Sequence, residues 1–150
     1  MALRLLTHSQ RSEAQLREGL VSREVEPALA DEIIERYREV GLLDDAALAS
    51  AIARTRHRER GRSRRAVGEE LRRKGFSHEH IEAALEQITA DDEREAATEL
   101  ARRRWDQLGS VPHDARVRRV VGMLGRRGYP PSLAFDIVKS LQRADTEGDT

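Results

Sequence analysis

A short pattern that occurs twice, 53 positions apart, constrains the fold of this chain more than any other feature. Leucine, two further residues, a basic residue, glycine and an aromatic residue follow one another at 71–76 (LRRKGF) and at 124–129 (LGRRGY). This order is typical of a Schellman helix end, in which the glycine is left-handed and the next residue packs back on the leucine. An amphipathic run follows each copy, so each motif predicts a corner between two helices.

A weaker third copy lies at 20–25, where Leu20 and Val25 hold the apolar positions and Glu24 replaces the glycine. Because a residue with a Cβ is strained in the left-handed conformation, we expect a less regular helix end there. Alanine-rich helical patterns precede the two later copies, at 45–58 and 92–107. Three helices in about 50 residues is the scale of a repeat architecture.

Strand signals are nearly absent, and the balance of 38% hydrophobic and 36% charged residues suits several small helical units better than one large core. We therefore predict an all-α fold of three tandem three-helix repeats in an extended, curved array. The expected boundaries are 1–43, 44–90 and 91–143, with a flexible tail at 144–150. In the first repeat only ALRLL (2–6) stands in place of an opening helix. Either that helix is short or the natural chain begins upstream.

Several residues predict where helices begin. Ser12 and Gln15 have the spacing of a capping box, Pro27 suits a first helical turn, and Ser77 suits an N-cap. The pairs Asp44–Asp45 and Asp91–Asp92 also precede helical runs. Acid–base or metal chemistry is an alternative role for these carboxylates, but N-capping accounts for them more simply.

The sequence offers little that points to catalysis. It has no cysteine, which excludes disulfides, zinc ribbons and thiol chemistry, and its five histidines lack the spacing of metal ligands. No phosphate-binding loop or dinucleotide fingerprint is present. We expect a cytoplasmic protein that is not an enzyme, with no cofactor, metal, membrane or small-molecule substrate.

Charge is segregated along the chain although the net charge is zero. Residues 54–74 carry ten basic and three acidic side chains, whereas 12–50 carry four basic and ten acidic ones. Arginines crowded around one turn repel one another unless phosphates or an acidic protein surface neutralise them. The contact candidates are Arg54, Arg56, Arg58, Arg60, Arg62, Arg64, Arg65, Arg72, Arg73 and Lys74. Weaker candidates, which helical spacing spreads around their helices, are Arg102, Arg103, Arg104, Arg116, Arg118, Arg119, Arg126 and Arg127.

Two stretches in this order, GLLDDAALASAIARTR (41–56) and GRSRRAVGEELRRKGFSHEHIEAAL (61–85), resemble the RecX regulatory proteins of bacteria. LRLLTHSQRSEAQL (3–16) and LGRRGYPPSLAFDIV (124–138) are similar to the first and last units of that family, and the arginine-rich style is like that of its actinobacterial members. The resemblance implies tandem three-helix repeats that bind the RecA recombinase filament on DNA. It also implies inhibition of strand exchange, ATP turnover and co-protease activity in DNA repair and the SOS response.

Two other interpretations stay open from the sequence. Three-helix units can act as stand-alone DNA-binding modules, since a helix in the major groove needs only a few polar side chains. The acidic character of 79–99 argues against the helix at 78–88 in that role. Alternatively, the repeats form a scaffold for another protein partner. In the RecA interpretation, single- or double-stranded DNA is met through the filament, and the arginine-rich segments contact phosphate or an acidic filament surface.

Overall fold

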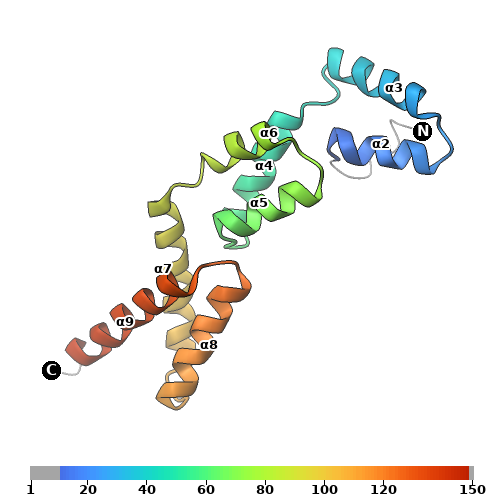
Figure 1. Cartoon of the computed structure of the whole chain (residues 1–150). Coiled ribbons are helices and arrows are strands. Elements are labelled where there is room, and N and C mark those ends of the chain that lie inside the picture. The colour runs from blue at the N-terminus through green and yellow to red at the C-terminus, as the bar shows by residue number, and fades with distance from the viewer. Residues whose placement is uncertain (1–10, 149–150) are drawn as a thin grey trace. The chain divides into compact units, whose positions relative to one another are not determined.

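The computed structural model describes residues 11–148, and within that range the chain is entirely helical (Figure 1). The helices are α2 (Glu13–Ser22), α3 (Pro27–Glu39), α4 (Asp45–Arg58), α5 (Arg64–Arg73), α6 (His78–Leu85), α7 (Ala90–Gln107), α8 (His113–Arg126) and α9 (Pro131–Gly148). The prediction of an all-α fold is confirmed. The expected opening helix at 2–6 lies outside the described residues.

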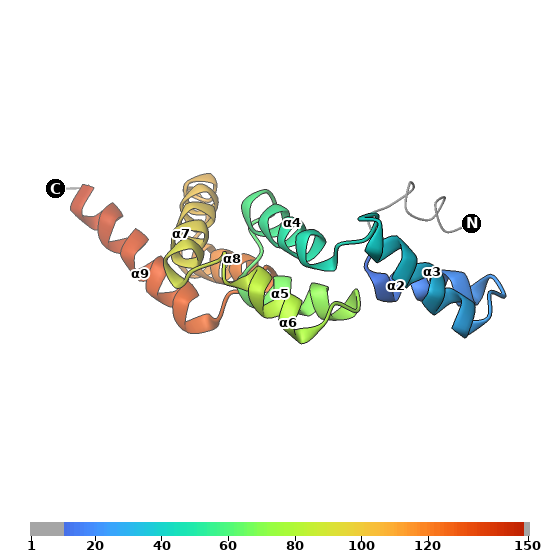
Figure 2. The ribbon, with the colours of Figure 1, turned by 90° about the horizontal axis from the view of Figure 1, so that it is seen from above.

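The helices divide into two compact units. One holds the described residues up to Arg54 together with Gly68–Gln87, and the other holds Thr55–Val67 and the residues from Ile88 onward. Helices α4 and α5 therefore contribute residues to both units. In the first unit α2 lies beside α3 (Figure 2), and in the second α7, α8 and α9 pack on one another.

Each of these packed groups has an apolar core of its own. Between α2 and α3 the buried cluster is formed by Leu16, Leu20, Ala30, Ile34 and Leu43. Among α7, α8 and α9 it is formed by Ala97, Ala101, Trp105, Leu108, Val120, Leu124, Tyr129, Ala134, Ile137 and Val138. The aromatic residues of the two glycine motifs, Phe76 and Tyr129, are both buried, as the Schellman pattern requires.

The two glycine motifs form the predicted helix ends. The Phe76 amide donates to the Leu71 carbonyl (3.2 Å), and the Tyr129 amide donates to the Leu124 carbonyl (3.0 Å). Gly75 has a φ of 83° and Gly128 has a φ of 94°. Both glycines are therefore in the left-handed region that side chains with a Cβ disfavour.

The expectation of an irregular helix end at Glu24 is wrong. Glu24 has a φ of 68°, and the Val25 amide donates to the Leu20 carbonyl (3.1 Å), as in the two glycine motifs. Glu24 is exposed, so its side chain meets no steric obstacle and only the backbone strain remains. Hydrogen bonding and packing of Leu20 hold the same corner without a glycine.

Most predicted helix starts are confirmed, with one correction. Ser12 and Gln15 form a complete capping box, and Asp44 accepts a hydrogen bond from the Ala47 amide (3.0 Å). Helix α7, however, begins at Ala90, two residues earlier than the aspartate pair indicated. Its N-cap is Thr89, and Asp92 is the third helical residue of a reciprocal capping box. The bonds from Thr89 hold the pKa of Asp92 below its ordinary value.

The chain after Arg143 also differs from the expected flexible tail. Helix α9 continues through 144–148 to Gly148. The Asp145 carboxylate accepts a hydrogen bond from the indole nitrogen of Trp105 (2.8 Å), so the last turns are tied to the core of the third repeat. Local patterns do not predict this contact, because its two partners are 40 positions apart.

The second repeat contacts the start of the first repeat's middle helix, α2. The buried Ser12 hydroxyl donates to the carbonyl of Lys74, the residue before Gly75. The next amide, that of Glu13, donates to the Asp45 carboxylate (3.0 Å). Burial raises the pKa of Asp45, although the bond from the Glu13 amide acts in the opposite direction. One hydroxyl group and one backbone amide at the start of α2 therefore form hydrogen bonds to the following repeat.

The same arrangement recurs in the other unit, at the start of α5. The amide of the buried Ser63 donates to the carbonyl of Arg127 (3.0 Å), the residue before Gly128. The following amide, that of Arg64, donates to the Glu93 carboxylate (2.6 Å). In both units, the start of a middle helix donates hydrogen bonds to two groups of the next repeat. One acceptor is an acidic side chain of that repeat's first helix, and the other is a carbonyl in its glycine turn.

The close approach explains why these two turns carry glycine. A Cβ on Gly75 would lie 2.5 Å from the Ala14 Cβ, and a Cβ on Gly128 would overlap the Ser63 hydroxyl and the Ala66 methyl. Gly41 is a useful contrast. It has a φ of 80°, but nothing lies within 4 Å of its missing Cβ.

Alanine substitutions separate the backbone requirement from the packing requirement. Gly41→Ala should lower the free energy of unfolding by about 1 kcal/mol, the cost of a left-handed residue. Gly75→Ala and Gly128→Ala should each cost about 2 kcal/mol or more, because a steric clash is added. Glu24→Gly should stabilise the chain by roughly 0.5–1 kcal/mol. Urea denaturation followed by circular dichroism measures all four, and equal costs at the three glycines would contradict this account.

Candidate functional site

The arginine-rich turn at 59–63 is held by contacts inside the second unit. Gly61 has a φ of 62°, and its missing Cβ would lie 2.6 Å from the Leu100 side chain. The buried His57 ring donates through Nδ1 to the Arg62 carbonyl (2.9 Å), which fixes the tautomer in which Nδ1 carries the proton. These contacts fix the backbone of the turn, so the positions of its arginines are defined.

The arginine candidates at 54–65 differ in whether their side chains already have a partner within the protein. Arg54 donates to the Gln87 side chain (3.0 Å). Four others already interact within the chain, namely Arg56, Arg62, Arg64 and Arg65. Arg58 and Arg60 are exposed, and within residues 11–148 their side chains make no hydrogen bond or ion pair. These two are the available cations of the turn.

The trio at the end of α5 divides in the same way. Arg72 and Arg73 are exposed, and neither has a side-chain hydrogen bond or ion pair in the described part of the chain. The Lys74 ammonium lies 3.8 Å from the Glu70 carboxylate, and its carbonyl accepts the bond from Ser12. Lys74 therefore contributes to the contact between repeats as well as to the surface.

In the third repeat, α7 satisfies its own arginines. Arg102 and Arg103 both bind the Glu99 carboxylate, at 2.9 and 3.1 Å, and Arg104 donates to Gln107 (3.1 Å). Each pair spans three or four positions on one helix, the spacing at which exposed pairs add a few tenths of a kcal/mol.

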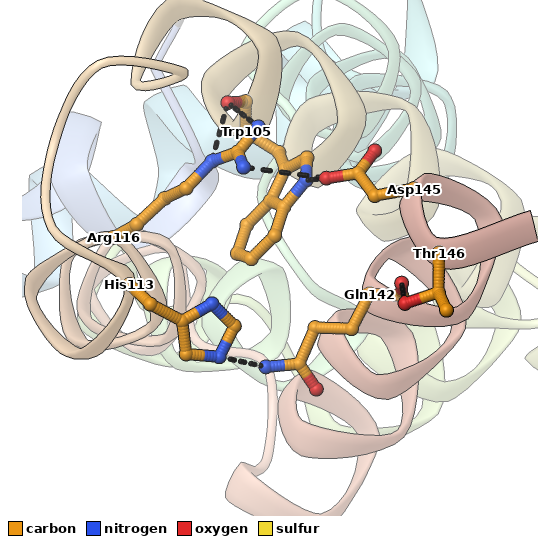
Figure 3. Close-up of polar contacts among 6 residues, drawn as sticks. All are labelled: Trp105, His113, Arg116, Gln142, Asp145 and Thr146. Carbon is orange, nitrogen blue, oxygen red and sulfur yellow. Dashed lines mark hydrogen bonds and ion pairs between the residues drawn. The ribbon is translucent and has the colours of Figure 1, made fainter. Parts of the chain in front are cut away.

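Arg116 is a structural residue and not a surface cation. Its guanidinium lies 3.7 Å from the centre of the Trp105 ring and donates to the Trp105 carbonyl through Nε (3.0 Å) and Nη2 (2.7 Å). Its Nη1 is 3.3 Å from the Asp145 carboxylate (Figure 3). His113 packs edge-on against the same indole and contacts Gln142 (2.8 Å). The cluster joins the end of α7, the start of α8 and the end of α9.

Arg127 has a structural role of a different kind. Its guanidinium donates to the Arg60 carbonyl, while its own carbonyl accepts the amide of Ser63. Arg127 therefore ties the glycine turn of the third repeat to the arginine-rich turn, both within the second unit. Its charge lies beside Arg60, which is one of the available cations.

The three remaining candidates, Arg118, Arg119 and Arg126, lie on one face of α8, although the sequence predicted that they spread around it. All three are exposed and make no side-chain hydrogen bond or ion pair among the described residues. Gly122 and Gly125 lie between them at positions that complete the same helical face. The sequence does not reveal this face, because Arg116 and Arg127 belong to the same basic region but fall on the other side of the helix.

Three further features of the described residues bear on the kind of site this chain can hold. Within 11–148, no group of three or more histidine, aspartate or glutamate side chains is placed to hold a metal ion. A polar hollow of about 540 Å³ beside α2 is lined by Arg11, Gln15, Glu18, Gly19, Ser22, Arg23 and Lys74. No described helix is long and apolar enough to cross a membrane.

The fold and surfaces define a class of protein: a tandem array of three-helix repeats, with inter-repeat contacts at the starts of middle helices and arginines on its exposed turns and helices. Family models narrow this further, because all three domains of one family match in order. They are RecX, first three-helix domain, at residues 1–36, RecX, second three-helix domain, at 44–85, and RecX, third three-helix domain, at 91–138. The chain belongs to the RecX family of regulatory, non-enzymatic proteins.

Similar proteins agree over nearly the whole chain. The Regulatory protein RecX of Thermobifida fusca is 39% identical over 145 residues, which cover 97% of this chain and 78% of the relative. That of Streptomyces coelicolor is 39% identical over 149 residues, covering 99% and 78%. That of Mycolicibacterium smegmatis is 40% identical over 142 residues, covering 92% and 76%. The resemblance to actinobacterial RecX proteins is confirmed.

Two crystal structures share the fold. One, of regulatory protein RecX, matches with a TM-score of 0.75 and 25% identity over 91% of this chain and 68% of its own. The other, of RecX from Lactobacillus salivarius, matches with a TM-score of 0.80 and 20% identity over 94% and 92%. Three-helix repeats are therefore the established architecture for this sequence.

The division into structural and surface arginines is testable by stability. Arg116→Ala should lower the free energy of unfolding by about 1–3 kcal/mol, because the part-buried Trp105 carbonyl loses both of its bonds from the guanidinium and the ring loses the cation stacked on it. The emission of Trp105, the one tryptophan in the sequence, should shift. Arg118→Ala and Arg119→Ala should change stability by less than about 0.5 kcal/mol. Equal effects of the three substitutions in thermal denaturation would show that Arg116 has no special structural role.

Proposed function

We propose that this protein regulates the RecA recombinase by binding RecA filaments assembled on DNA, and that it slows strand exchange, ATP turnover and co-protease activity. Membership of the RecX family, matched in all three domains, is the observation that carries this proposal. The arginine surfaces supply the chemistry that such a partner needs, because a nucleoprotein filament exposes both phosphates and acidic side chains.

The available arginines are the proposed contact residues. Among the candidates, seven have side chains that make no hydrogen bond or ion pair within residues 11–148, namely Arg58, Arg60, Arg72, Arg73, Arg118, Arg119 and Arg126. An arginine already held by an internal carboxylate or carbonyl gains less from a new anion, since the old bond must break. Arg116 and Arg127 therefore leave the proposed contact set, and Arg102–Arg104 rank below the others.

A stand-alone DNA-binding module is the second candidate function. The exposed arginines on α8 favour it, because they would serve a phosphate backbone equally well without a protein partner. It differs from the main proposal in one measurable respect. A stand-alone module would bind DNA tightly and with sequence preference when RecA is absent.

RecA-driven strand exchange, with and without the purified chain, tests the proposed function. Stoichiometric protein should slow exchange and reduce ATP turnover by the filament. Removing two available charges in Arg58→Gln/Arg60→Gln should weaken filament binding about tenfold, since both contribute to electrostatic attraction.

The matched control is Arg102→Gln/Arg103→Gln, which removes the same charge from arginines that bind Glu99. This control should bind filaments nearly as well as the unaltered chain. Unchanged strand exchange at stoichiometric amounts would exclude the proposed function. If the two double variants bound filaments equally, the turn at 59–63 would not be a contact.

A further inference from the structure

The exposed face of α8 can be compared directly with the same face of α2 and α5. The buried residues Leu20, Leu71 and Leu124 occupy equivalent places in the three middle helices, and this fixes the register of the outer positions. One outer position lies two residues before the buried leucine of each middle helix, and in α2 it holds Glu18. The equivalent residue in α5 is also acidic, whereas α8 has a glycine there.

This outer position lies two residues before each of those leucines, and it is Glu18, Glu69 and Gly122 in turn. Its neighbours on the same face also change. At the positions of Arg118, Arg119 and Arg126, α2 has Ala14, Gln15 and Ser22. The same face of α5 carries Arg65, Arg72 and Arg73 beside Glu69, so α8 differs from α5 by its two glycines and the loss of the acidic residue, and not by its number of arginines. The α8 face consists of Arg118, Arg119, Gly122, Gly125 and Arg126.

The two glycines of this face have no evident role inside the protein. A Cβ on Gly125 would meet nothing within 4 Å, and a Cβ on Gly122 would meet only the end of the flexible Arg126 side chain, at 3.3 Å. Glycine inside a helix costs about 1 kcal/mol relative to alanine. Neither glycine needs a left-handed backbone, since neither has a positive φ. Packing and backbone conformation within the described residues therefore do not account for them.

We propose that the α8 face formed by Arg118, Arg119, Gly122, Gly125 and Arg126 binds the phosphate backbone of DNA. The three arginines supply charge-assisted hydrogen bonds to phosphate oxygens, and arginine is well suited to bidentate phosphate contact. The space beside Gly125 is open and that over Gly122 holds only the movable end of the Arg126 side chain, so a sugar–phosphate chain can lie close to the helix among the guanidinium groups. Backbone contacts of this kind position a protein on DNA without reading its sequence.

The inference deepens the proposed function, because it assigns the DNA of the filament to one surface of the third repeat. It can nevertheless be tested without RecA. The probe is a fluorescently labelled oligothymidylate, and the measurement is its anisotropy on titration with the full chain at several salt concentrations. The triple variant Arg118→Gln/Arg119→Gln/Arg126→Gln should bind at least about tenfold more weakly. Its slope of log affinity against log salt should be smaller by about 2, because three phosphate contacts are lost.

Two further variants keep the result interpretable. Arg102→Gln/Arg103→Gln/Arg104→Gln removes the same net charge from α7, where these side chains bind Glu99 and Gln107, and it should bind DNA nearly normally. Gly125→Leu adds a side chain where nothing lies within 4 Å, so the helix should become more stable. The same substitution should weaken DNA binding severalfold. A loss of binding in a more stable protein cannot come from unfolding.

The outcomes separate this inference from the proposed function. Equal DNA binding by the two triple variants would overturn the inference, whether or not the chain regulates RecA. If the α8 variant lost filament binding but kept binding to free DNA, the face would contact an acidic protein surface, which also overturns it. If the unaltered chain bound DNA through α8 but had no effect on strand exchange, the inference would stand and the proposed function would fail.

Discussion

The contact on which the rest of the structure depends is the docking of one repeat on the first turn of the preceding repeat's middle helix. A helix start leaves amide groups without partners, and burial makes them costly unless they are satisfied. Here the following repeat supplies the acceptors. Asp45 receives the Glu13 amide in one unit, and Glu93 receives the Arg64 amide in the other. Helix capping and repeat assembly are therefore the same interaction.

The third repeat has an ion pair near the start of its own middle helix, which involves a side chain and not a backbone amide. Asp145 is paired with Arg116 across 29 positions, the same separation as between Glu93 and Arg64. In the third repeat the acidic residue, Asp145, belongs to the last turns of α9. For the second repeat the acidic residue, Glu93, belongs to α7, the first helix of the next repeat. Trp105 is enclosed by this arrangement, which explains why residues 144–148 are helical and not a tail.

Local chemistry made much of the fold predictable. The capping box at Ser12, the proline start of α3 and both glycine corners depend on residues a few positions apart, so the sequence predicts them. Glu24 shows the limit of such rules, because tertiary packing holds it in a conformation that its side chain disfavours. The cap at Thr89 was missed because aspartates in a first helical turn and aspartates at an N-cap look alike in sequence.

The candidate site was predictable in composition but not in detail. All seven proposed contact arginines belong to the predicted set, yet the sequence could not separate Arg116 or Arg127 from Arg118 and Arg126. The distinction depends on partners 11 to 67 positions away, which helical periodicity does not reveal. The glycines of α8 were not predicted to matter, because they make no contact that a sequence pattern could indicate. Their importance lies in the empty space beside them, and only the folded structure shows that space.

Amide hydrogen exchange in the native chain tests the docking contact most directly. The amides of Glu13, Ser63 and Arg64 lie at helix starts, where exchange is ordinarily fast, yet each is bonded to the following repeat. The account predicts that all three are protected, and that Gly128→Ala selectively removes protection at Ser63 and Arg64. Rapid exchange of these amides in the unaltered chain, or unchanged protection in the variant, would contradict it.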